Sequence, residues 1–210
     1  MSDHSTNTMR ARLAHHSSLI EKVLEYHFSG AVTSELLLRD QPFELLRTDC
    51  DRDVYDLVIE ANGIIRHIQL KGQVLGGAAG QVTAHVKLAD KPSACILWMT
   101  YDPATLRPIS WRFFGGAPGE RIPSLGDRLA RHSRGNRLGE KGLRPNHRII
   151  PTGLFERIDD IGHLVDRLFG TADGRRSEET VPSILGQPDR ERRRQTAASP
   201  KLLTRLDICS

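Results

Sequence analysis

Hydrophobic positions recur with two different periods along the chain, and these periods predict helices at both ends of a domain with strands between them. Between residues 18 and 39, Ile20, Val23 and Leu24 recur at helical spacing, and Gly30 interrupts the pattern. This segment therefore predicts one kinked helix or two short helices.

Runs rich in β-branched and aromatic residues follow this region and predict strands. FELLRT (43–48) predicts a first strand. CILWMTY (95–101) is apolar throughout, which predicts a central strand buried on both faces. SWRFFG (110–115) predicts a further strand, whereas VTAHVKL (82–88) fits either a strand or a short helix.

Helical spacing returns between Phe155 and Leu168 and predicts an amphipathic helix of about four turns. Beyond Gly170 the composition shifts to small, polar and charged residues, which predicts a mostly disordered tail. The first residues are polar and show no periodicity. The predicted organisation is a disordered arm over 1–16, an α/β domain over 17–170 and a disordered tail over 171–210.

The segment VYDLVIEANGIIRHIQLK (54–71) predicts a β-hairpin, because Asn62-Gly63 separates two strand-like runs. A two-residue turn at this point places Asp56 opposite Gln69. Opposed residues share a face of the sheet, and Lys71, two residues after Gln69, shares that face as well. A carboxylate, an amide oxygen and an ammonium group are therefore expected to converge.

The opposite face of this hairpin is predicted to be apolar. Because side chains alternate along a strand, a register slip of one residue would mix the polar and apolar sets, so the pattern specifies its own register. The residues expected on the apolar face are Tyr55, Leu57, Ile59, Ile64, Ile68 and Leu70, with Arg66 as the one exception.

The polar trio has the chemistry needed for phosphodiester hydrolysis. Mg²⁺, or Mn²⁺ in its place, prefers oxygen ligands, which the Asp56 carboxylate, the Gln69 side chain and the Leu70 carbonyl would supply. Lys71 would orient a water molecule or stabilise the negative charge that develops on phosphorus.

Asp56, a short hairpin and then Gln69-Leu70-Lys71 resemble the D…(D/E/Q)xK signature of the PD-(D/E)XK nucleases, which include restriction enzymes and Holliday-junction resolvases. The wider segment is also similar to small bacterial proteins assigned to this superfamily. The resemblance covers residues ~18–115 and implies a restriction-endonuclease-like α-β-β-β-α-β core, in which helices flank a mixed sheet.

Two features of this resemblance concern single residues. Gln69 stands where the superfamily usually has an acid, and a neutral amide there should weaken metal binding. The superfamily also often adds a glutamate from the helix before the first strand. Glu35 is the first choice for this role, and Glu21 and Glu25 are alternatives because Gly30 obscures the phase of the helix.

Charge is distributed unevenly over the 210 residues, although the formal net charge is only +4. Residues 112–148 contain nine arginines and lysines against three acids, a pattern typical of a segment that binds a polyanion. The candidates for phosphate contacts in a nucleic acid are Arg131, Arg134, Arg137, Lys141 and Arg144.

Neither a membrane nor a secreted location is expected from the sequence. No apolar run approaches the roughly 20 residues that span a bilayer, and the first fifteen residues contain no apolar signal-peptide core. The three cysteines are odd in number and lack metal-like spacing, which favours a reducing cytoplasm.

These patterns together predict a divalent-metal-dependent nuclease that acts on DNA. Two alternatives remain open: an inactive nuclease fold that serves as a nucleic-acid-binding module, and a small globular protein whose basic segment binds a protein partner. Superfamily members often act as dimers, so a homodimer is a further expectation, but no apolar stripe in the sequence identifies an interface.

Overall fold

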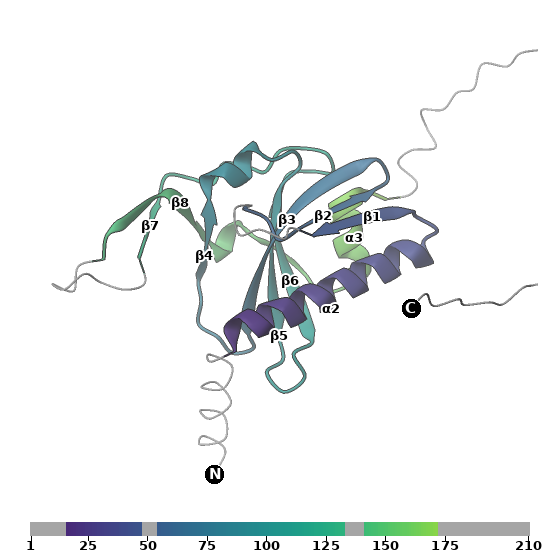
Figure 1. Ribbon diagram of the computed structural model, residues 1–210, viewed down its shortest axis with the longest axis horizontal. Coiled ribbons are helices and arrows are strands. Elements are labelled where there is room, and N and C mark those ends of the chain that lie inside the picture. The colour runs from purple at the N-terminus through teal and green to yellow at the C-terminus, as the bar shows by residue number, and fades with distance from the viewer. Residues whose placement is uncertain (1–15, 48–53, 133–140, 172–210) are drawn as a thin grey trace, which may run out of the picture. The chain divides into compact units, whose positions relative to one another are not determined.

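The longest helix of the computed structural model, α2 (Ser17–Leu38), packs along one face of a large sheet (Figure 1). The structure describes residues 16–47, 54–132 and 141–171. The buried residues of α2 include Ile20, Leu24, Phe28, Val32 and Leu36, which repeat every four residues and form one stripe. The helix is continuous through Gly30, so the segment forms one helix and not two.

Six strands form the large mixed sheet, in the order β1-β2-β3-β5-β6-β9. All neighbouring strands are antiparallel except β3 and β5, which are parallel. The predicted strand that begins at Phe43, the two strands on either side of Asn62-Gly63 and the strand over 110–115 are confirmed. The strand bounds are β1 Phe43–Arg47, β2 Leu57–Ala61, β3 Ile64–Val74, β5 Cys95–Tyr101, β6 Pro108–Gly115 and β9 Glu156–Ile158.

A smaller antiparallel sheet has the order β4-β8-β7. Its strands are β4 Gln81–His85, β8 Leu143–Pro151 and β7 Leu129–Arg131. The segment over 82–88 was predicted to be either a strand or a short helix, and it contains both. The strand β4 is followed directly by the short 3₁₀ helix η1 (Val86–Asp90).

The hairpin between β2 and β3 has the predicted turn and register. Asn62 and Gly63 have φ angles of 53° and 65°, and two successive positive φ values are typical of a type I′ turn. Ala61 pairs with Ile64, and Leu57 pairs with Ile68.

Two hydrophobic cores lie on opposite faces of the large sheet. The first is covered by α2 and by α3 (Ile161–Phe169), and the second lies between the large sheet and the small sheet. β5 serves both cores, since Leu97 and Met99 belong to the first and Ile96 and Trp98 to the second. This confirms that β5 is a central strand buried on both faces.

The predicted helix over 155–168 is wrong in its first half. Residues 156–158 form β9, and α3 begins only at Ile161, where the Asp160 side chain accepts a hydrogen bond from the His163 backbone N–H. Ile158 is buried against Trp111 as a strand residue. The apolar residues of β9 and α3 pack into the same core. Their combined spacing along the chain matches that of a helix by coincidence.

The connection between β3 and β5 also differs from the α-helix that the resemblance implied. It contains β4 and the 3₁₀ helix η1. The architecture is thus α/β, with a mixed six-stranded sheet, two helices on one of its faces and a three-stranded sheet on the other.

The predicted disordered arm and tail lie outside the described residues, apart from His16 and Thr171. Within the ranges that are described, no helix combines the length and apolar character needed to cross a membrane.

Candidate active-site pocket

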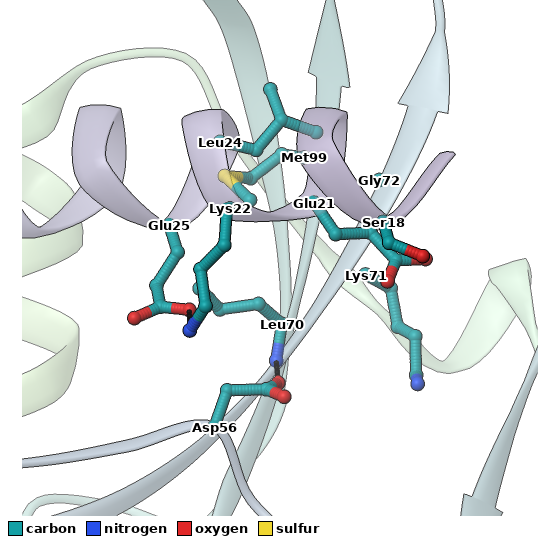
Figure 2. Close-up of a pocket in the computed structure, with 10 residues that line it drawn as sticks. All are labelled: Ser18, Glu21, Lys22, Leu24, Glu25, Asp56, Leu70, Lys71, Gly72 and Met99. Carbon is teal, nitrogen blue, oxygen red and sulfur yellow. Dashed lines mark hydrogen bonds and ion pairs between the residues drawn. The ribbon is translucent and has the colours of Figure 1, made fainter. Parts of the chain in front are cut away.

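A pocket of about 470 Å³ lies between the N-terminal half of α2 and the second half of β3 (Figure 2). β2 ends its pairing opposite Ile68, and β3 continues to Val74 in register with β5. The pocket therefore opens where β3 extends past β2. The charged residues that line it are Glu21, Lys22, Glu25, Asp56 and Lys71.

Asp56 reaches this pocket because the backbone is irregular just before β2. The Asp56 N–H donates to the Ile68 carbonyl at 2.9 Å, while Leu57 is the register partner of the same residue. Two residues opposite one is the arrangement of a β-bulge, which redirects a side chain. Asp56 thus lines the pocket beneath α2, together with Leu70 and Met99.

The same irregularity corrects the predicted apolar face. Tyr55 does not pack with Leu57 and Ile59 but against the second core, where its ring centroid lies 4.8 Å from that of His67. Side chains alternate strictly between the two faces of the sheet from Leu57 onward. Before Leu57, the bulge shifts this alternation by one residue. The sequence carries no glycine or proline there to signal a bulge.

The Asp56 carboxylate has opposing influences on its ionisation. Its Oδ2 accepts a hydrogen bond from the Leu70 N–H at 2.6 Å. Burial raises the pKa of Asp56, and the negative charge of Glu25 raises it further. The Leu70 hydrogen bond and the positive charges of Lys71 and Lys22 lower the pKa, but the net shift is upward.

Glu25 is the glutamate of α2 that is buried beside Asp56, with 5% of its surface exposed. Lys22 Nζ lies 2.7 Å from Glu25 Oε2, and Arg47 Nε lies 3.6 Å from Glu25 Oε1. The second distance is an ion pair too long to be a hydrogen bond, so Oε1 accepts none within the described residues. Figure 2 shows Lys22 and Glu25 extending from α2 toward Asp56.

The helix phase selects the two alternative glutamates over the first choice. Glu21 and Glu25 are one turn apart and both line the pocket. Glu35 lies ten residues beyond Glu25, about 15 Å along the helix axis. It pairs there with Arg39, which also contacts Asp166 of α3. Glu35 is therefore not at the pocket.

The structure does not bring Gln69 to the pocket, although Lys71 on the same strand lines it. The Gln69 amide nitrogen donates to the Val54 carbonyl at 3.0 Å, and its Oε1 is buried without a hydrogen-bond partner in the described part of the chain. Figure 2 shows Lys71 extending on the other side of Leu70 from Asp56.

Gly72 leaves room for a side chain of α2 beside the pocket. A Cβ atom on Gly72 would lie 2.7 Å from Leu24 Cδ1 on the helix. A larger residue at this position would therefore require the Leu24 side chain to shift.

The candidate phosphate contacts lie at the small sheet or outside the described residues. Arg131 ends β7, and its Nη1 donates to the Lys141 carbonyl at 3.3 Å. Arg144 lies on β8. The other two candidates, Arg134 and Arg137, fall in the undescribed range 133–140.

Sequence reasoning missed Lys22 as a pocket residue. The sequence did contain a sign of this role, since Lys22 and Glu25 have the i,i+3 spacing that brings side chains together on a helix.

Within residues 16–47, 54–132 and 141–171, no three His, Cys, Asp or Glu side chains form a group that could hold a metal ion. The pocket is lined instead by three acids and two lysines.

Comparison with known proteins adds no identification. No family model matches this chain, and no curated protein matches it at a significant level.

Proposed function

We propose that the pocket between α2 and β3 is the active site of a divalent-metal-dependent nuclease with a restriction-endonuclease-like core. The observation that carries the proposal is a buried carboxylate, Glu25, beside a half-buried one, Asp56, in a single pocket. Burial raises the pKa of Asp56, and the negative charge of Glu25 raises it further. Two neighbouring like charges that are withdrawn from water are costly unless cations compensate for them, and such arrangements are typical of functional sites.

The donor set of this pocket fits a hard divalent cation. Asp56 and Glu25 would hold Mg²⁺ or Mn²⁺, with the Leu70 carbonyl as a neutral ligand. The buried Glu25 Oε1 that accepts no hydrogen bond is the atom that supports this fit. When bound, the ion would polarise the scissile phosphate and make a coordinated water more acidic. Gln69 has no ligand role in this proposal, because it does not line the pocket.

The residues of the chain itself would bind and orient the substrate. Lys71 and Lys22 offer positive charge for the phosphate oxygens, and both are close enough to lower the pKa of Asp56. The Leu70 N–H fixes the Asp56 carboxylate through the 2.6 Å hydrogen bond. Lys71 would stabilise the added negative charge of the transition state, which requires a positioned cation and no proton transfer.

The alternative function is a nucleic-acid-binding module without catalysis. One observation favours it: Lys22 already lies 2.7 Å from Glu25 Oε2 and so compensates the charge that a metal ion would otherwise meet. Such a pocket could bind phosphate through its lysines and hold no metal.

Nicking of supercoiled plasmid DNA tests the proposal. We expect cleavage by the full chain in Mg²⁺ or Mn²⁺ and none in chelator. Lys71→Ala and Glu25→Gln should each lower the rate by about 100-fold or more, the size of effect seen when one transition-state contact is removed. Cleavage that persists unchanged in both variants would overturn this site.

Matched controls separate local effects from general ones. Lys87→Ala removes an exposed lysine of η1, and Glu60→Gln removes an exposed acid of β2, so both should retain the wild-type rate. If no protein cleaves but the full chain binds DNA in a salt-sensitive manner, the binding module is the correct function.

A further inference from the structure

A group of basic side chains on the small sheet lies outside the proposed reaction. His85 of β4 and His147 of β8 are directly opposed, and their ring centroids lie 4.9 Å apart. Arg144, three residues before His147, donates from Nη2 to His147 Nε2 at 2.5 Å. Strand pairing and side-chain contacts thus hold three basic groups together, and we refer to His85, Arg144 and His147 as the basic triad.

Among the described residues, no acid forms an ion pair with the triad. Burial lowers the pKa of His147, and positive charges lower it further, from Arg144 on its own strand, His85 on β4, Lys71 on β3 and His132 after β7. None of the ion pairs formed by described residues includes any of these groups. A cluster of basic side chains that has no acid partner in the described part of the chain favours an anion at this position.

The hydrogen bonds of the two histidines determine what each can donate. His85 Nδ1 accepts from the Lys87 backbone N–H, so its proton is on Nε2 and it can donate without becoming charged. His147 Nε2 faces the Arg144 donor. Protonation of that nitrogen would place two donors face to face, a conflict that an anion accepting from both would remove.

Lys71 lies near both the pocket and the triad. It lines the pocket, and its positive charge is one of those that lower the pKa of His147. A nucleic acid carries phosphates at regular intervals and so has the chemistry to contact both groups. A single small anion would fill only one of them.

We propose that His85, Arg144 and His147 form a second phosphate subsite, which holds a backbone phosphate of the nucleic acid whose scissile phosphate lies in the α2–β3 pocket. The choice of nucleic acid as the ligand rests on the proposed function. The subsite binds best when His147 is protonated, so affinity rises as the pH falls.

Fluorescence anisotropy with a short labelled DNA duplex in chelator tests this subsite without requiring cleavage. Affinity for the full chain should increase as the pH falls between about 8 and 5, the range in which histidine gains its charge. His147→Gln should lose this added pH dependence, and Arg144→Gln should weaken binding about tenfold at every pH. Wild-type affinity and pH dependence in His147→Gln would overturn the subsite.

Two variants of α3 and β9 serve as matched controls. His163→Gln removes an exposed histidine and Arg157→Gln an exposed arginine, each on an element outside the small sheet and each next to an acid. Both should bind as the wild type does. A loss of affinity in the controls equal to that in the triad variants would also overturn the proposal.

A second measurement on unaltered protein guards against misfolded variants. NMR titration of the His147 ring should show that the DNA duplex raises its pKa, because a phosphate stabilises the imidazolium. An unchanged pKa would contradict the subsite. If orthophosphate at the same phosphate concentration has an equal effect, the ligand is a small phosphate, and the choice of nucleic acid is wrong.

The outcomes for the two proposals are separable. Plasmid cleavage that requires Lys71, together with unaltered DNA binding by His147→Gln, supports the nuclease and rejects the subsite. Absence of cleavage, together with binding that requires His147, rejects the nuclease and supports the subsite.

Discussion

Asp56 is a carboxylate whose charged form is disfavoured by its surroundings. Burial and the neighbouring Glu25 raise its pKa from the ordinary 3.8, although the Leu70 N–H and the two nearby lysines oppose the shift. Between 3.8 and the raised value, the folded state binds more protons than the unfolded state. Stability therefore falls as the pH rises through this window and stays lower above it.

Asp56→Asn is accordingly expected to stabilise the protein at neutral pH while impairing cleavage. The amide keeps the shape of the side chain and removes a half-buried charge. The free energy of unfolding, measured with urea at pH 7, should exceed that of the wild type, and the difference should shrink below about pH 4. Asp127→Asn, which alters an exposed acid, should leave stability unchanged. A less stable Asp56→Asn at pH 7 would contradict this interpretation.

At the scale of elements, the end of α3 depends on a buried arginine of β3. Arg66 is 0% exposed, and its guanidinium donates to the carbonyls of Leu168 at 2.8 Å and Arg167 at 3.1 Å. The last carbonyls of a helix have no partner within the helix. The single polar exception on the apolar face of the hairpin therefore satisfies the end of a helix about a hundred residues later in the chain.

Arg66→Met should destabilise the fold by about 2–4 kcal/mol, because it leaves these buried carbonyls without donors. The methionine side chain preserves much of the volume, so the loss reports the hydrogen bonds more than a cavity. Chemical denaturation measures the effect. Arg107→Met, at an exposed position before β6, is the control and should change stability by less than about 0.5 kcal/mol.

At the scale of the whole described domain, one aromatic side chain joins the two sheets. Phe155 follows η2 (Thr152–Leu154), between the small-sheet strand β8 and the large-sheet strand β9. Its ring centroid lies 5.7 Å from that of Trp98 and 5.5 Å from that of Phe114.

Phe155→Ala should cost about 2 kcal/mol of stability, less than the loss for a fully buried phenylalanine because Phe155 is only partly buried. Hydrogen exchange at the β4 and β8 amides should accelerate more than exchange in β5, since the small sheet loses its anchor. Leu154→Ala, which alters an exposed neighbour, should affect neither measurement. Equal acceleration in both sheets would contradict a separate role for this contact.

Local pattern was sufficient where neighbouring residues determine the conformation. Asn62-Gly63 specified the turn, and the apolar alternation from Leu57 onward specified the register and the face of each strand residue. The run over 95–101 was long and apolar enough to indicate a strand buried on both sides. These features depend on the backbone preferences of single residues and on the alternation of side chains along a strand. Both can be read from the sequence.

Other features were decided only by contacts between distant segments. The bulge at Asp56 separated it from Gln69, and the phase of an uninterrupted α2 brought Glu25 to the pocket in place of Glu35. The pairing of His85 with His147 joins strands far apart in the chain. Such contacts depend on how whole elements pack, and a local period carries no information about an irregularity of one residue or about which distant strand becomes a neighbour.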